Sequence, residues 1–195
     1  MKRFFGLILN RRVYKVLTIV MVCCWAIFGI NVAVKFVYRF GYPVKYKTEV
    51  VKASVEFGLD EFLIFSMIKT ESGFNEKAVS DKGAIGLMQI TEKTGEYIAE
   101  KLGVEDYDLK NAEDNIYFGC YYVKYLITRF KDLNVALCAY NAGEGNVSLW
   151  LLDERYSSDG ETLKEVPFKE TKEYVDRINK TLIKYKKLYT NILDK

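Results

Sequence analysis

The chain has 195 residues, of which 50% are hydrophobic and 28% are charged, enough for one domain with a sizeable core and an additional segment. It contains no histidine, which excludes a Ser-His-Asp triad, a Cys-His pair and any metal centre with histidine ligands. If the chain is an enzyme, its proton transfers must run through carboxylates, tyrosine or lysine.

Charge is distributed unevenly along the chain. The first 43 residues hold seven basic residues and no acidic residue. The remaining 22 basic and 26 acidic residues give that part a formal net charge of −4. A mildly acidic domain without a basic block argues against nucleic acid as a partner.

Residues 16–34, VLTIVMVCCWAIFGINVAV, carry no charge, and this run is long enough to cross a hydrocarbon core about 30 Å thick as a helix. Five basic residues precede the run, which favours a cytoplasmic N-terminus. They are Lys2, Arg3, Arg11, Arg12 and Lys15. We therefore predict a single-pass protein of the cell membrane, with a basic cytoplasmic segment at 1–15, a transmembrane helix at 16–34, a linker at 35–45 and an extracytoplasmic globular domain at 46–195.

A cleaved signal peptide is the alternative to the membrane anchor. It would have a shorter apolar core and a cleavage site of small residues. The segments VAVKF and FGYPV, which follow the run, offer no convincing site of that kind. Lys35 and Arg39 lie after the run, so the basic residues are not confined to one side. The uncleaved anchor is the favoured interpretation.

The four cysteines form two pairs. Cys23 and Cys24 lie inside the apolar run, whereas Cys120 and Cys138 lie in the predicted domain. An oxidising compartment would permit a disulfide between the second pair. The usual burial of free cysteine favours two buried thiols instead. Two cysteines without histidine argue against a zinc site, and we expect no metal and no cofactor.

From residue 46 onward, the apolar residues recur mainly at helical spacing, which predicts an all-α domain. The predicted helices cover 46–57, 60–72, 91–102, 112–131, 134–152 with a break at AGEG, and 170–192. The last of them carries an apolar stripe of Val175, Ile178, Leu182, Tyr185, Tyr189 and Ile192. Residues 74–91 show little periodicity, so a loop is predicted there, with room for a small hairpin.

Glu71 is the first candidate catalytic residue. It lies at the C-terminal end of a helix that is apolar on nearly every side, where it gains neither a favourable helix dipole nor full hydration. Both effects raise the pKa of a carboxyl group, as a general acid requires. The alternative is that Glu71 extends into solvent, as most glutamates do.

Two further segments stand out. In GAIGLMQI at 83–90, the two glycines weaken a helix and the apolar residues do not alternate as in a strand, so the glycines indicate a close approach of the backbone to another group. In AYNAG at 139–143, Tyr140 and Asn141 offer hydrogen-bonding groups, although Asn141 and Gly143 are also ordinary helix-ending residues.

Five motifs occur in a characteristic order along the chain. They are ESGF at 71–74, GAIGLMQI at 83–90, NIYFG at 115–119, AYNAG at 139–143 and ETKEYV at 170–175. Together they resemble the lytic transglycosylases of the soluble-lytic-transglycosylase (SLT) type. The resemblance covers about residues 46–185 and implies a lysozyme-like fold. One departure is Thr91, where the family often has proline.

The resemblance also implies roles for individual residues. Glu71 matches the family's single catalytic acid/base. Five other positions match polar residues of the substrate cleft: Ser80, Gln89, Tyr140, Asn141 and Glu170. Of these, Tyr140 matches the tyrosine that orients the catalytic carboxylate, and Glu170 matches a glutamate on the side that carries the substrate's peptide. Gly83 and Gly86 would let the backbone pass close to the sugar chain.

The expected function is cleavage of the bond between N-acetylmuramic acid and N-acetylglucosamine in peptidoglycan glycan strands, leaving 1,6-anhydromuramoyl ends. One alternative is a goose-type-lysozyme-like hydrolase, in which Asp81 would be the second carboxylate that an inverting enzyme needs about 6.5–9.5 Å away. Another is a non-catalytic cell-wall-binding module, against which the presence of Glu71 with its tyrosine and glutamine partners argues.

Overall fold

The computed structural model describes the backbone of residues 11–193 and the side chains of residues 11–34 and 36–190. The chain divides into two compact units, one within residues 1–43 and one within residues 44–195. Each unit is considered by itself. Residues 1–10 of the predicted cytoplasmic segment lie outside the described residues.

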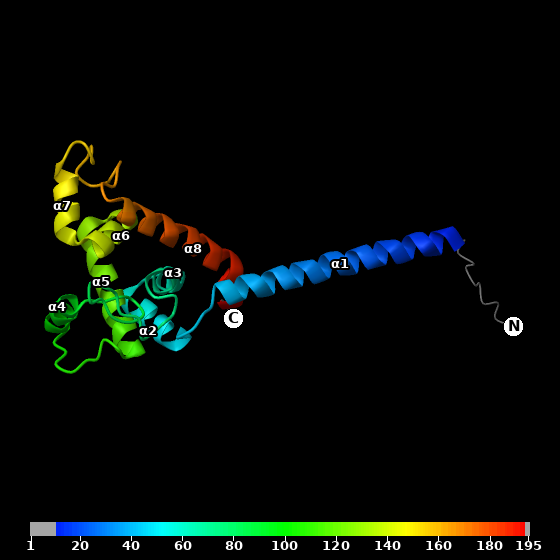
Figure 1. Ribbon diagram of the computed structural model, residues 1–195, viewed down its shortest axis with the longest axis horizontal. Coiled ribbons are helices and arrows are strands. Elements are labelled where there is room, and N and C mark those ends of the chain that lie inside the picture. The colour runs from blue at the N-terminus through cyan, green and yellow to red at the C-terminus, as the bar shows by residue number, and fades with distance from the viewer. Residues whose placement is uncertain (1–10, 194–195) are drawn as a thin grey trace. The chain divides into compact units, whose positions relative to one another are not determined.

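In the described part of the first unit, residues 11–43, there is a single helix, α1 (Arg11–Gly41), shown in blue in Figure 1. Its 31 residues correspond to about 46 Å of helix, at 1.5 Å per residue. It includes the predicted span and also residues 35–41 of the predicted linker. Among the described residues, it is the one helix long and apolar enough to cross a membrane, and none of that apolar stretch is buried within the chain.

The second unit is helical, as the sequence predicts (Figure 1). Its helices are α2 (Lys47–Phe57), α3 (Glu61–Glu71), α4 (Glu92–Leu102), α5 (Ala112–Phe130), α6 (Leu133–Ala142), α7 (Glu144–Leu152) and α8 (Lys169–Leu193). The loop at 74–91 contains two isolated antiparallel bridges, Val79–Ile85 and Ile85–Ile90, in place of the small hairpin. Within residues 11–193 there is no regular strand.

The helix ends follow local capping chemistry. The Asp60 side chain accepts a hydrogen bond from the backbone N–H of Phe62, and the Thr91 side chain accepts one from Thr94. Gly58 ends α2 and Gly103 ends α4, each in the left-handed conformation that glycine adopts readily. These boundaries confirm the predicted ones. Only the break at AGEG is shorter than expected, because Gly143 alone separates α6 from α7.

The core of the domain forms on both sides of α5, which packs against α2, α4 and α6 (Figure 1). Helix α8 packs along α3 and α6, and its Tyr185 ring stacks on Phe65 at 5.7 Å between centroids. Its buried hydrophobic residues are Tyr174, Val175, Ile178, Tyr185 and Tyr189; the Ile192 side chain of the predicted stripe lies outside the described side chains. The packing of α8 on α3 covers the helix that ends at Glu71.

The two cysteines of the domain, Cys120 and Cys138, are buried free thiols, which confirms the favoured interpretation. Burial raises the pKa of both thiols well above the ordinary value, so neither is a reactive thiolate.

Candidate active site

Glu71 is the last residue of α3 and is partly buried. Its Oε1 atom accepts a hydrogen bond of 2.5 Å from the hydroxyl of Tyr174 on α8. Tyr174 is only 2% exposed, so the bond lies on the inner side of the carboxyl group. The packing of α8 on α3 therefore places a hydroxyl donor on an acid that is 103 residues away in sequence.

The environment of Glu71 raises its pKa from 4.5 to about 7. Burial is the largest cause, because it disfavours the charged form. The hydrogen bond from Tyr174 and the positive charge of Arg177 both lower the pKa, by less than burial raises it. A carboxyl group with a pKa near neutrality can give up and take back a proton at physiological pH, as a general acid/base must.

The Tyr140 hydroxyl bonds to the loop at 74–91 rather than to Glu71. Its hydroxyl donates a hydrogen bond to the carbonyl oxygen of Met88, at 2.7 Å, and a hydroxyl has a single proton to donate. The charge of Glu71 contributes, after burial, to raising the pKa of Tyr140, so the two groups lie close enough to interact. Tyr140 thus holds the glycine-containing loop next to Glu71, while the donor on Glu71 itself is Tyr174.

Buried polar side chains hold the loop at 74–91 against the helices. The Ser72 hydroxyl, next to Glu71, donates to the carbonyl oxygen of Leu87 at 2.9 Å. Asn115 of α5 makes three bonds: its Oδ1 accepts from the Met88 N–H at 2.7 Å, and its Nδ2 donates to the carbonyl oxygens of Ile85 and Leu109. Because Asn115 is 1% exposed, these bonds are protected from water.

Gly86 is required by the protein's own packing. A Cβ atom on it would lie 2.4 Å from the Asn115 Nδ2 atom and 2.8 Å from the Leu109 carbonyl oxygen. Its φ of +78° also favours glycine. Gly83 has a similar φ of +77° but no atom within 4 Å of that position. The predicted close approach of the backbone to another group therefore exists at Gly86, where that group is Asn115 with the Leu109 backbone.

Gln89 and Ser80 both bond within the loop. The Gln89 Nε2 atom donates to the carbonyl oxygens of Gly86 at 2.9 Å and Ala78 at 3.3 Å, and the residue has a positive φ of 51°. The Ser80 Oγ accepts from the Ala84 N–H at 3.0 Å. Both side chains therefore stabilise the conformation of the loop through bonds to its own backbone.

Asn141 and Glu170 lie near the start of α8. The Asn141 Oδ1 accepts a hydrogen bond of 2.7 Å from the hydroxyl of Thr171, which is buried, so this contact joins α6 to α8. Glu170 is exposed in the first turn of α8. The structure thus brings Glu71, Tyr140 and the segment before Gln89 together. Glu170 lies about one turn of α8 before Tyr174, and Asn141 of α6 bonds to its neighbour Thr171.

Sequence reasoning missed Tyr174 and Asn115 as individual residues. Both lay inside quoted motifs, ETKEYV and NIYFG, and a polar residue on an otherwise buried helix face is the signal that could have found them. Among the described residues, no three His, Cys, Asp or Glu side chains lie together as ligands of a metal ion would.

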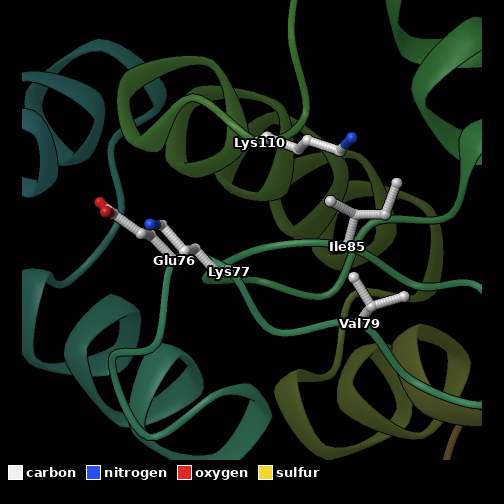
Figure 2. A pocket seen from close by; sticks show the side chains of 5 residues that line it. All are labelled: Glu76, Lys77, Val79, Ile85 and Lys110. Carbon is white, nitrogen blue, oxygen red and sulfur yellow. The ribbon is translucent and has the colours of Figure 1, made fainter.

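A hollow of about 350 Å³ lies on the loop at 74–91, lined by Glu76, Lys77, Val79, Ile85 and Lys110 (Figure 2). None of the six predicted site residues is among them. Its single carboxylate, Glu76, accepts a hydrogen bond of 3.0 Å from the Tyr46 hydroxyl. In Figure 2, the Glu76 carboxylate points away from Val79 and Ile85. Glu71 therefore remains the candidate acid.

Comparison with known proteins agrees with this geometry. Residues 49–163 match the family model described as the transglycosylase SLT domain. The soluble lytic murein transglycosylase of Salmonella typhimurium is 30% identical over 143 residues, which cover 70% of this chain and 22% of that protein. The membrane-bound lytic murein transglycosylase C of Photorhabdus laumondii is 34% identical over 116 residues, which cover 53% of this chain and 32% of that protein.

Solved structures show the same fold. An inactive mutant of the lytic transglycosylase Slt from Pseudomonas aeruginosa superposes with a TM-score of 0.66 at 31% identity, over 75% of this chain and 25% of that one. The 70 kDa soluble lytic transglycosylase of Escherichia coli superposes with a TM-score of 0.68 at 25% identity, over 77% and 25%. In each of these comparisons the match covers a third or less of the relative's length. The motifs, the helical fold around Glu71 and these matches together show that the chain belongs to the transglycosylase SLT domain family.

Proposed function

We propose that this chain is a membrane-anchored lytic transglycosylase that cleaves the β-1,4 bond between N-acetylmuramic acid and N-acetylglucosamine in peptidoglycan. The observation that carries the proposal is the Glu71 carboxyl group, whose pKa is raised to about 7 while Tyr174 holds one of its oxygens. Several relatives are named as murein transglycosylases, which supports the substrate class.

In the proposed reaction, protonated Glu71 donates its proton to the glycosidic oxygen as the bond from that oxygen to C1 of the muramoyl residue breaks. The 2-acetamido group of the substrate stabilises the positive charge that develops at C1. Glu71, now a carboxylate, takes the proton of the muramoyl 6-hydroxyl, whose oxygen bonds to C1. The product is a 1,6-anhydromuramoyl end, no water is consumed and Glu71 is protonated again. One carboxyl group therefore suffices.

A hydrolase would need a second carboxylate to activate water. The candidate from the sequence, Asp81, is exposed within the turn that begins at Ser80. The reaction through Glu71 alone needs no role for Asp81. We therefore expect Asp81→Asn to keep more than a tenth of the wild-type activity.

Mass spectrometry of the products from purified peptidoglycan tests the proposed reaction. The expected products carry anhydromuramoyl ends, in both the wild-type protein and Asp81→Asn, without added metal or cofactor. Reducing muramoyl ends as the main product, together with an inactive Asp81→Asn variant, would establish a hydrolase instead.

Membrane anchoring is the second part of the proposal. It is supported by the exposed apolar length of α1, by the basic residues that precede it and by relatives named as membrane-bound. Protease added outside intact spheroplasts or protoplasts should digest residues 44 onward and spare a tag placed before Met1. Protection of the domain from protease would reverse the orientation and separate the enzyme from its substrate.

A further inference from the structure

Asn31 is a polar residue on the apolar helix α1. It lies inside the charge-free run at 16–34, and its side chain is exposed on the helix surface. Its Nδ2 atom donates a hydrogen bond of 2.8 Å to the carbonyl oxygen of Ile27, one turn earlier. A carboxamide has two N–H donors and an acceptor oxygen, so one N–H and the oxygen keep their capacity to bond. The hydrocarbon of a bilayer offers these groups no partner, which makes their exposure to lipid costly.

Asn31 shares one side of α1 with residues that recur at alternating spacings of three and four. They are Leu17, Val20, Cys24, Ile27, Asn31 and Val34, and all are exposed. This is the spacing of the a and d positions of a coiled coil, where two helices meet along a seam. A membrane helix is apolar at nearly every position, so apolar residues alone do not select one side of it. Asn31 does select one, because its polar groups gain most by being covered, and we name this side the Asn31 seam.

A shallow hollow of about 470 Å³ lies on the same side of α1. Its lining residues are Cys24, Ile27, Phe28, Asn31 and Val32. Three of them belong to the Asn31 seam, and the other two, Phe28 and Val32, flank it. A side chain from a neighbouring helix can fill such a hollow, as a knob fills a hole in a coiled coil. Apolar contact surface therefore lies directly beside the amide that lacks a full set of partners.

We propose that α1 associates in the membrane with the α1 of a second copy of this chain, along the Asn31 seam. The inference rests on the proposed membrane anchoring. A second copy is the partner that the chemistry favours, because a carboxamide carries both donor and acceptor and can bond to an identical group. Hydrogen bonds between side chains of neighbouring helices stabilise helix pairs in membranes, and a single Asn at an a position fixes the register of a coiled coil.

The two copies of α1 would run parallel. Copies inserted with the same basic N-terminal segment have the same orientation, so equal positions of the seam face each other. Asn31 then lies opposite Asn31, and Cys24, one heptad earlier, lies opposite Cys24. Cys23 lies about 100° around the helix from Cys24, at the edge of the seam, where equal positions of a parallel pair lie on opposite sides. The chain thus carries a cysteine on the seam and a control cysteine next to it.

Cross-linking of the full chain in vesicles of phosphatidylethanolamine and phosphatidylglycerol tests this placement. After oxidation with copper phenanthroline, the remaining thiols are blocked and disulfide-linked dimers are measured on non-reducing gels. Cys23→Ser, which keeps Cys24, should form about fivefold more linked dimer than Cys24→Ser, which keeps Cys23, because a disulfide needs closely opposed thiols. Cys120 and Cys138 are buried in the domain and are common to both variants.

The association constant is measured by energy transfer between dye-labelled N-terminal tags at decreasing protein-to-lipid ratios. Asn31→Leu should lower it by about three- to thirtyfold, which equals about 0.6–2 kcal/mol, the range for hydrogen bonds between membrane helices. Thr18→Val is the matched control. The Thr18 hydroxyl also donates to a carbonyl oxygen one turn earlier, that of Tyr14 at 2.8 Å, but Thr18 lies about 140° around the helix from Asn31. This variant should keep the wild-type association constant.

Three results would overturn the inference. They are chains that stay monomeric at every protein-to-lipid ratio, linked dimers that form equally through Cys23 and Cys24, and equal losses in Asn31→Leu and Thr18→Val. The fate of the proposed anchoring is read separately, by alkaline carbonate extraction of the wild-type chain. Release from the membrane would reject the anchor and the association with it, whereas chains that stay in the membrane as monomers would reject only the association.

Discussion

The loop at 74–91 and helix α8 both pack beside the end of α3, but polar side chains contribute differently to the two. The loop buries Phe74, Leu87, Met88 and Ile90, and side chains from other segments also bond to its backbone, chiefly Asn115, Ser72 and Tyr140. Helix α8 depends on apolar packing against α3, from which one polar group, the Tyr174 hydroxyl, reaches the acid. The difference teaches that packing determines the proton affinity of Glu71, whereas buried amide and hydroxyl groups fix the backbone of the loop.

The largest expected effect is the loss of activity when Glu71 itself is replaced. Glu71→Gln keeps the size of the side chain and can still accept the hydrogen bond from Tyr174, but it cannot exchange a proton. Activity on purified peptidoglycan should fall by about 10²–10⁴-fold, the usual contribution of general acid/base catalysis. Circular dichroism should show the same helix content as the wild type. Activity within threefold of the wild type would remove Glu71 from the proposed role.

Two glycine substitutions in the loop at 74–91 test how closely its backbone packs against Asn115 and Leu109. Gly86→Ala forces a Cβ atom against Asn115 and the Leu109 backbone, whereas Gly83→Ala has the same positive φ and open space. We expect Gly86→Ala to lower the free energy of unfolding by about 3 kcal/mol or more, since overpacking adds about 1–3 kcal/mol to the strain at positive φ. Gly83→Ala should lose only about 1 kcal/mol for the strained backbone. Chemical denaturation measures both, and equal losses would mean that the close approach at Gly86 is unimportant.

The burial of Glu71 predicts how the free energy of unfolding depends on pH. Because the folded protein raises the pKa of Glu71 from 4.5 to about 7, the folded state holds this proton more tightly than the unfolded state. The contribution of Glu71 to stability is therefore fully present below pH 4.5, falls as the pH rises toward 7, and is absent above that. The total loss is up to about 3 kcal/mol.

The comparison with Glu71→Gln isolates this contribution, since the other ionisable groups are common to both proteins. The variant should be similar to the wild type at pH 4.5 and more stable at pH 8. Urea denaturation at the two pH values checks this. A difference that is the same at both would mean that burial does not raise the pKa of Glu71.

The smallest expected effect separates the two tyrosines. The bond from Tyr174 lowers the pKa of Glu71, so Tyr174→Phe should shift the high-pH limb of the activity profile further upward and reduce the rate by about three- to tenfold. Tyr140→Phe loses the bond to the Met88 carbonyl oxygen and should raise KM through the loop without moving that limb. A shift of the limb in Tyr140→Phe but not in Tyr174→Phe would return the orienting role to Tyr140.

The two regions also differ in how much the sequence reveals. Helix α8 and its apolar stripe followed from periodicity, and caps such as Asp60 and Thr91 were recognisable because capping is local in sequence. The site residues came from motifs, which place Glu71 and Tyr140 in one cleft but do not say which hydroxyl donates to which oxygen. That choice depends on how α8 is rotated against α3, and a one-residue difference on a helix surface exchanges Tyr174 for Val175.

The bonds of the loop were beyond sequence reasoning for a related reason. The side chain of Asn115 bonds to three backbone groups that lie up to 30 residues away, and no period or spacing in the sequence records such contacts. Gly86 was singled out correctly as a point of close approach, but the sequence did not reveal that Asn115 lies against it. Local chemistry was therefore predictable, and long-range polar contacts were not.

A titration of the Glu71 carboxyl group by carbon-13 NMR tests the central claim most directly. Glutamate labelled at the carboxyl carbon gives one resonance that is absent from Glu71→Gln, and this difference assigns it. The burial of Glu71 beside Tyr174 predicts a midpoint at about pH 7. A midpoint near the ordinary value of 4.5 would contradict the account, because Glu71 would then be charged at neutral pH and would have no proton to donate.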